Sequence, residues 1–125
     1  LFIAEFIVDS TVVYRAGVSI DDNADVYKLV LSSSSDVNAS TNSIVTPKVL
    51  RNSTGTAATI GNGTIKYYIL KSTDLTVVRR TSIDFTNNAE FAAATLTLTD
   101  ADTKDGKGNE WDLTVNCELT AQVLS

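Results

Sequence analysis

Apolar and polar residues alternate along much of the chain, a two-residue period that is typical of β-strands with one buried face. The clearest case is residues 110–123, in which every second residue from Leu113 to Val123 is apolar. Similar segments, rich in Val, Ile, Thr, Tyr or Phe, recur at short spacing. They predict strands over 1–9, 11–20, 25–32, 43–50, 64–71, 74–79, 81–86, 90–99 and 110–123. The chain is therefore expected to be all-β.

Turn-forming residues separate these segments, notably GNG at 61–63 and DGKGN at 105–109. Residues 89–94 are rich in Ala, the best helix former, but the Thr–Leu alternation that follows favours a strand. Pro47 cannot donate to a sheet ladder and predicts an edge strand or a strand start. Short strands with these turns predict an antiparallel β-sandwich, immunoglobulin-like or jelly-roll, in one domain over residues 10–125.

The strand-like content of the first twenty residues is far longer than an ordinary strand. A break near Asp9–Ser10 divides it into an N-terminal arm, residues 1–9, and the first strand of the domain. On a strand, the even-numbered residues from Phe2 to Val8 project to one side and the odd-numbered ones to the other. The apolar residues predicted to form a subunit interface are Leu1, Phe2, Ile3, Ala4, Phe6, Ile7 and Val8.

This arm either completes its own sandwich or adds as a strand to a neighbouring copy of the chain. Burial of its large side chains at about 1.5–3 kcal/mol each offers on the order of 10 kcal/mol, which is similar to the cost of ordering about eight residues. In having an apolar N-terminal arm before an all-β domain, the sequence resembles the subunits of extracellular filaments linked by donor strands. Head-to-tail strand exchange does not close on itself and generates filaments.

Composition and charge restrict the classes of partner. The 125 residues are enough for one domain with a real core, and 43% hydrophobic with 20% charged residues is typical of globular proteins. A net charge of -5 gives no basic field for nucleic acid, and no apolar run reaches the roughly eighteen residues that a membrane helix needs. The chain contains no Met and starts at Leu1, from which we expect a removed secretion signal and an extracellular or cell-surface location.

Catalytic and redox chemistry find little support in the sequence. The chain contains no His, so Ser-His-Asp, Cys-His and imidazole metal sites are excluded, and we expect no enzyme. The single Cys117 falls on the apolar face of its strand and is expected in the core. Tyr67 and Tyr68, flanked by basic residues, would suit single-stranded nucleic acid, but we interpret this segment as an ordinary hairpin with one Tyr pointing in and one out.

The strongest local motif is DADTKDGKGNE at 100–110. Its oxygen donors, which would suit Ca²⁺, are Asp100, Asp102, Asp105, Asn109 and Glu110. The register differs from that of an EF-hand, because Lys104 stands at the fifth position and Gly106 at the seventh. We therefore expect no cofactor and interpret the segment as a long hairpin loop between strands 90–99 and 110–123, with a Ca²⁺ site as the alternative.

Three N-x-[ST] sequences are candidate glycosylation sites, at Asn38, Asn52 and Asn62. Chance alone predicts roughly two such matches in a chain with this content of Asn, Ser and Thr. They are consistent with export.

These observations predict a secreted structural subunit that assembles with copies of itself into a pilus-like filament, with residues 1–9 as the linking strand. The first alternative is a viral capsid, tail or decoration protein, in which a similar arm would reach neighbouring subunits. The second is a secreted carbohydrate- or protein-binding module. Helical fibres would support the filament subunit, and closed particles would support the viral protein.

Overall fold

The structure, a computed structural model, describes residues 2–8, 13–18, 27–51 and 53–124, and describes side chains from residue 27 onward. The protein is mostly β. The strands are β1 (Phe2–Val8), β2 (Val13–Val18), β3 (Tyr27–Ser33), β4 (Ser43–Arg51), β5 (Ile60–Lys71), β6 (Val77–Phe85), β7 (Leu96–Leu98) and β8 (Leu113–Val123). A short helix, α1 (Asn88–Ala92), and a 3-10 helix (Asp100–Thr103) lie on either side of β7. Neither helix of the described part is long and apolar enough to cross a membrane.

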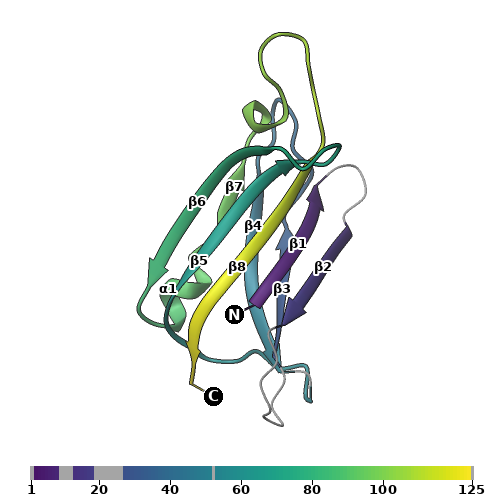
Figure 1. Cartoon of the computed structure of the whole chain (residues 1–125). Helices are drawn as coiled ribbons and strands as arrows, with labels where there is room; N and C mark the ends of the chain where they lie inside the picture. The colour runs from purple at the N-terminus through teal and green to yellow at the C-terminus, as the bar shows by residue number, and fades with distance from the viewer. Residues whose placement is uncertain (1, 9–12, 19–26, 52, 125) are drawn as a thin grey trace.

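The strands form two antiparallel sheets (Figure 1). The five-stranded sheet has the order β2-β1-β8-β5-β6, and the three-stranded sheet has the order β3-β4-β7. Both chain termini lie toward one end of the molecule, which also carries α1 (Figure 1). The β3–β4, β5–β6 and β7–β8 connections lie at the opposite end, which we call the hairpin end.

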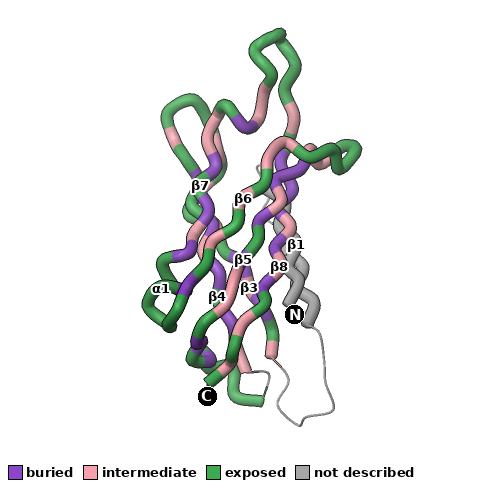
Figure 2. Tube along the Cα trace, turned by 60° about the vertical axis from the view of Figure 1, so that its left-hand side comes forward, coloured by how far each residue is buried: buried purple, intermediate pink, exposed green. Residues whose placement is uncertain are grey.

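One hydrophobic core is shared by the two sheets (Figure 2). The alternation predicted for the last strand is confirmed, because Leu113, Val115, Cys117 and Leu119 are all fully buried. They pack in one cluster with buried residues of the smaller sheet: Leu29, Leu31, Val45, Val49, Leu96 and Leu98. Alternation along each strand therefore places its apolar residues between the sheets.

A buried hydrogen bond crosses this core. The Tyr67 hydroxyl, on β5, donates to the carbonyl oxygen of Ala94 at 2.6 Å. Ala94 lies between α1 and β7, so the bond ties the larger sheet to the connection that enters the smaller one. Burial, followed by the nearby Cys117, raises the pKa of Tyr67 far above its ordinary value. The hydroxyl therefore remains a donor at any pH at which the protein is handled.

The strand predicted over 90–99 is wrong in its first half, where the chain forms α1. Asn87 accepts a hydrogen bond from the Glu90 backbone N–H at 2.9 Å, and Glu90 accepts one in return from the Thr86 N–H at 2.9 Å. The first bond caps the helix, and the second joins Glu90 to the residue before the cap. Phe91 is buried with its ring centroid 5.2 Å from that of Phe85, which fixes the helix against the core.

Other predicted boundaries also differ. Segments 74–79 and 81–86 are one strand, β6, and the GNG sequence at 61–63 belongs to β5 rather than to a turn. The pairing of β5 with β8 is irregular between Ile60 and Gly63. A Cβ on Gly63 would lie 2.7 Å from the Cα of Ala121, so glycine there allows the close approach of β8.

The segment between β7 and β8 is not the hairpin loop that we predicted. β7 belongs to the smaller sheet and β8 to the larger, so the connection passes from one sheet to the other. The prediction of an edge strand or a strand start at Pro47 is wrong, because β4 is the middle strand of the smaller sheet and Pro47 is in the middle of β4. The pairing of β4 with β7 ends at Val45, two residues before Pro47. At Pro47, β4 therefore pairs only with β3.

Candidate functional site

The N-terminal arm forms β1, an inner strand of the larger sheet of its own chain. All seven residues of β1 pair with β8, from Phe2 opposite Leu119 to Val8 opposite Leu113. On its other side β1 pairs with β2 from Phe2 to Ile7. Among the predicted interface residues, Leu1 lies outside the described residues, and the other six, Phe2, Ile3, Ala4, Phe6, Ile7 and Val8, belong to β1.

The register of β1 brings one of its residues opposite the only cysteine. Ala4 is paired with Cys117, and on the other side of β8 the same cysteine is opposite Tyr67. Cys117 is fully buried, as predicted. Burial, and then the charge of Glu118, raises the pKa of its thiol well above the ordinary range, so the folded protein holds it as an unreactive thiol.

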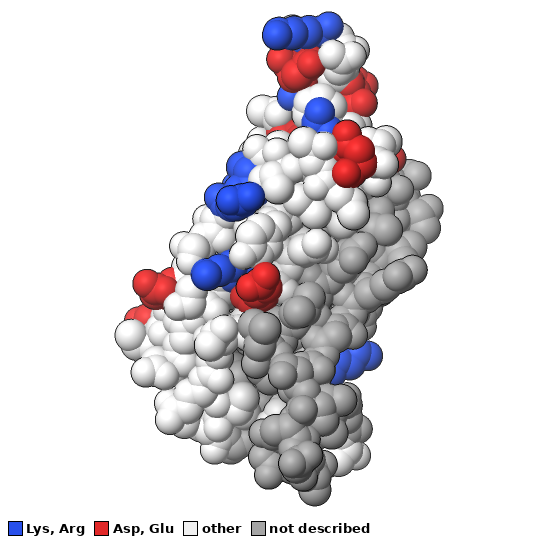
Figure 3. Space-filling model, in the orientation of Figure 1, with Lys and Arg blue, Asp and Glu red and all other residues white. Residues whose placement is uncertain are grey.

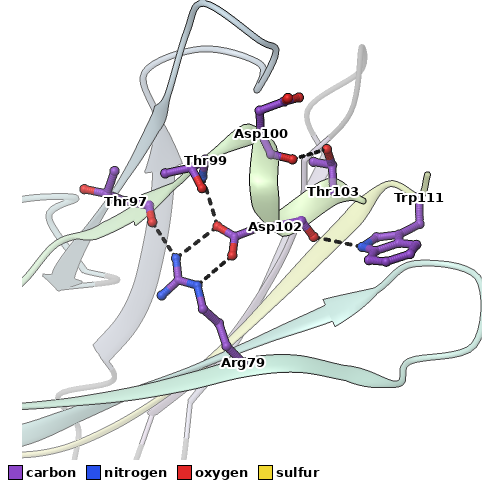
Figure 4. A network of polar contacts seen from close by, with 7 residues as sticks. All are labelled: Arg79, Thr97, Thr99, Asp100, Asp102, Thr103 and Trp111. Atoms are coloured by element: carbon purple, nitrogen blue, oxygen red, sulfur yellow. Dashed lines mark hydrogen bonds and ion pairs between the residues drawn. The ribbon is translucent and has the colours of Figure 1, made fainter. Parts of the chain in front are cut away.

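The hairpin end contains a polar network around Asp102 (Figure 4). Arg79, on β6, donates to both carboxylate oxygens of Asp102, through Nε at 2.8 Å and Nη2 at 3.1 Å. The same Nη2 donates to the carbonyl oxygen of Thr97, on β7, at 2.6 Å. The Thr99 N–H donates to Asp102 at 2.9 Å. The network therefore links the edge of the larger sheet to β7 of the smaller sheet and to the 3-10 helix that follows β7.

The charge of Asp102 is stabilised by these contacts. Burial by itself would raise its pKa, but the hydrogen bonds and positive charge of Arg79, with the Thr99 hydrogen bonds, outweigh burial and lower the pKa below its usual range. The backbone carbonyl of Asp102 also accepts the indole N–H of Trp111 at 2.8 Å. Asp102 thus orients the start of the segment that leads into β8.

Two further interactions hold the segment after the 3-10 helix. Lys104 lies 2.8 Å from Asp100 and 3.9 Å from Glu110, and its hydrogen bond to Asp100 is the main reason that its pKa is raised. Asp105 accepts bonds from the Asn109 side chain at 2.8 Å and from the Lys107 N–H at 2.7 Å. These bonds, the Asn109 one first, lower the pKa of Asp105.

The five candidate Ca²⁺ ligands therefore do not converge on one point. Asp102 pairs with Arg79, Asp100 with Lys104, and Asp105 with Asn109. Within the part of the chain that the structure describes, no group of three or more acidic or Cys side chains could hold a metal ion. The donors of this motif instead shape the loop.

An open cavity of about 790 Å³ lies at the hairpin end. Its walls come from the β3–β4 connection, the β5–β6 turn and the segment that includes the 3-10 helix and the start of β8. The lining residues are Asp36, Val37, Asn38, Ala39, Thr73, Asp100, Thr103, Lys104, Glu110, Trp111 and Asp112. Acidic and basic groups stand side by side at this end of the molecule (Figure 3).

The aromatic and basic residues of the β5–β6 hairpin are divided among three places. Tyr67 is buried and Tyr68 is half-buried on the outer face, which confirms the prediction of one Tyr in and one out. Tyr68 stands opposite Arg80. Lys71 instead covers the Trp111 ring, with Nζ 4.0 Å from the ring centroid, and Arg79 binds Asp102.

The candidate glycosylation sites occupy different settings. Asn38 is exposed in the β3–β4 connection, where its side chain accepts bonds from the N–H and hydroxyl of Ser40. Asn62 is exposed on β5. Asn52 lies outside the described residues.

Sequence reasoning missed the Arg79–Asp102 pair and the cavity beside Trp111. Arg79, on β6, and Asp102, in the 3-10 helix, are 23 residues apart, so no local pattern relates them. The one available signal was that Asp102 lies in a short polar segment between two apolar strands. No family model, curated protein or solved structure matches this chain.

Proposed function

We propose that this chain is a structural subunit that self-assembles into an extracellular, pilus-like filament by donating its N-terminal strand to a neighbouring copy. The domain in this proposal is a β-sandwich, the architecture shared by immunoglobulin-like and jelly-roll domains. Its partners are copies of itself, and its role is mechanical rather than catalytic.

The observation that carries the proposal is the place of β1 in the larger sheet. β1 is at the N-terminus, yet it is an inner strand, and its seven pairs with β8 join segments more than a hundred residues apart in sequence. If β1 left this position, the N–H and C=O groups along one side of β8 would lose their partners. An open strand edge of this kind is a template for a strand from another chain.

The β1 of a second copy would restore the same register. Because every pair between β1 and β8 is reproduced, exchange loses none of these contacts, which is why swapping of identical elements is a low-cost route to assembly. A head-to-tail series of such exchanges leaves one free β1 and one open β8 edge at the two ends. It therefore grows without closing.

The register supplies a direct test, because Ala4 stands opposite Cys117. Directly opposed residues of antiparallel strands have Cα atoms about 4.5–5.5 Å apart, which lies within the range that a disulfide spans. When the chain is folded and assembled from the unfolded state under oxidising conditions, Ala4→Cys should therefore form a disulfide with Cys117. Non-reducing gel electrophoresis then shows whether the two cysteines belong to one chain.

After assembly at high protein concentration, the proposal expects a ladder of covalent dimers, trimers and longer species from Ala4→Cys. The matched control is Glu5→Cys, which faces Asn116 in the register and has no cysteine opposite. A product that migrates only as a monomer with an internal disulfide would contradict the proposal, and a product that stops at the dimer would refute a filament.

A second test removes residues 1–9. The shortened chain should lose assembly, and the free LFIAEFIVD peptide should bind it in the position of β1. A peptide with Pro in place of Ala4 and Phe6 is the control, because Pro cannot donate to the ladder. Electron microscopy of the full chain should show fibres, whereas closed particles would favour the viral alternative.

A further inference from the structure

The strand β6 has a free edge, with no strand paired to it among the described residues. The larger sheet has the order β2-β1-β8-β5-β6, and β6 pairs only with β5. β6 runs along one long side of the molecule (Figure 1). Every second residue of an edge strand directs its backbone N–H and C=O groups away from the sheet. Over its nine residues, β6 therefore presents a row of hydrogen-bonding groups that can pair with another strand.

Three exposed side chains follow one another on the outer face of β6: Arg80, Ser82 and Asp84. Asp84 accepts a hydrogen bond from the Thr64 hydroxyl at 2.6 Å, and Arg80 stands opposite Tyr68 on β5. Neither charged group forms an ion pair with a residue that the structure describes. A cation and an anion at equal distances along the strand from Ser82 are therefore available to a partner.

This spacing of charges is self-complementary under two-fold symmetry. In an antiparallel pair of β6 strands from two copies, directly opposed residues lie on the same face of the joined sheet. When the pair is centred on Ser82, Arg80 of each copy stands opposite Asp84 of the other. Centring on Thr81 places Arg80 opposite Ser82. Centring on Ile83 places Asp84 opposite Ser82, so both charge pairs are lost in each of these registers.

The inner face of β6 is compatible with the register centred on Ser82. Arg79, the inward-pointing charge of β6, is bound to Asp102 and to the Thr97 carbonyl within its own chain. It therefore brings no unpaired charge to the contact. On the same face, Thr81 of each copy meets Ile83 of the other, and both of these residues are half-buried.

We propose that β6 is an interaction surface for a second copy of this chain, which it binds as an antiparallel, two-fold symmetric strand pair centred on Ser82. The pair joins two five-stranded sheets edge to edge. A two-fold contact uses the same patch on both copies, so it closes at the dimer. β6 lies three strands from β1 in the sheet, so this contact is separate from strand exchange and goes beyond the filament role.

A cysteine at the two-fold axis tests the contact. Opposed Cα atoms in antiparallel strands are about 4.5–5.5 Å apart, so Ser82→Cys in the native full chain should form a disulfide between two copies in a glutathione redox buffer. We expect a covalent dimer on a non-reducing denaturing gel. Lys66→Cys is the matched control, because it is exposed opposite Ser82 but lies on β5, one strand further from the axis. It should form at least about tenfold less dimer, and Cys117 is buried in both variants.

Charge reversal in the Ser82→Cys background tests the register. Arg80→Asp or Asp84→Arg alone places like charges opposite each other twice, and each should slow dimer formation by about tenfold. The double variant restores both opposite-charge pairs and should return the rate to within about threefold of the parent. A general effect of charge predicts the opposite for Asp84→Arg, because this change lowers the net negative charge of the chain and favours the thiolate of a nearby cysteine.

The proposal is overturned if Lys66→Cys gives as much dimer as Ser82→Cys, if Asp84→Arg does not slow the reaction, or if the double variant stays as slow as the single ones. No step of this test depends on β1. Its failure therefore leaves the filament proposal standing, and a failed disulfide ladder from Ala4→Cys leaves the β6 contact standing.

Discussion

The Tyr67 hydroxyl tests whether the two sheets share one cooperative core. Tyr67→Phe keeps the ring but removes the 2.6 Å bond to the Ala94 carbonyl, and both residues are buried. The Ala94 carbonyl is then left without this donor in a site that water does not reach. Loss of one partner in a buried hydrogen bond costs about 1–3 kcal/mol, so we expect the free energy of unfolding to fall by this amount.

Urea denaturation followed by circular dichroism measures this change as a lower midpoint with an unchanged slope. Tyr68→Phe is a matched control, because it removes the same atom from the neighbouring, half-buried residue on the outer face of β5. We expect this control to change stability by less than about 0.5 kcal/mol. Equal effects of the two substitutions would refute the buried bond, and with it the connection between β5 and the α1–β7 segment.

Three further substitutions test the hairpin end, the close strand approach and the core. Asp102→Asn should cost about 1–3 kcal/mol near neutral pH, less than a fully buried pair because Arg79 is 37% exposed. The pKa of Asp102 is lowered in the folded protein, so its contribution to the free energy of unfolding is complete above the unfolded pKa of about 3.9 and is lost as the pH falls through the folded pKa. The stabilities of the wild type and of Asp102→Asn, plotted against pH, should therefore converge in acid. Parallel curves would contradict this reasoning. Gly63→Ala should cost about 1–3 kcal/mol, because its Cβ would meet the Ala121 backbone, whereas Gly106→Asn, in open space at φ 77°, should cost less than about 1 kcal/mol. Cys117 should react with a thiol reagent only as fast as the fold opens, so native protein that is labelled within seconds would contradict its burial.

The sequence predicts those elements whose cause is local. The alternation in β8 is enough to place Leu113 and Cys117 in the core, because a strand facing a core on one side requires that pattern. A strand was favoured over the helix α1 because the stability of α1 comes from the Asn87 cap, the Glu90–Thr86 bond and one buried Phe, which outweigh a weak strand preference over a few residues. The local pattern is therefore enough to predict the eleven-residue strand β8 but not the five-residue helix α1.

The network and cavity at the hairpin end could not be predicted in this way. Asp102 was a candidate Ca²⁺ ligand, but its carboxylate pairs with the guanidinium of Arg79 on β6. The cavity depends on three connections that the topology brings to one end. Only the crossing of the chain from β7 in one sheet to β8 in the other, which sequence patterns do not indicate, brings Trp111 next to Val37.

The antiparallel hairpin of β1 and β2 limits how strand exchange can build a filament. β1 and β2 are joined by the four residues 9–12. If this connection straightened, β1 would continue the line of β2 and enter a copy facing the opposite way, and the two copies would exchange strands reciprocally as a closed dimer. The proposed filament therefore needs β1 and β2 to move together as a hairpin.

A prediction about the length of the connection between β2 and β3 follows from this geometry. Eight residues join β2 to β3, and shortening the connection to an exchanged element disfavours its return to the same chain. Deletion of residues 21–24 should therefore increase the disulfide ladder of Ala4→Cys at a given protein concentration. Four Gly or Ser residues inserted within 9–12 should leave the ladder unchanged, because this connection travels with the hairpin. If the insertion abolishes the ladder while the deletion has no effect, β1 exchanges without β2 and this route to a growing filament is refuted.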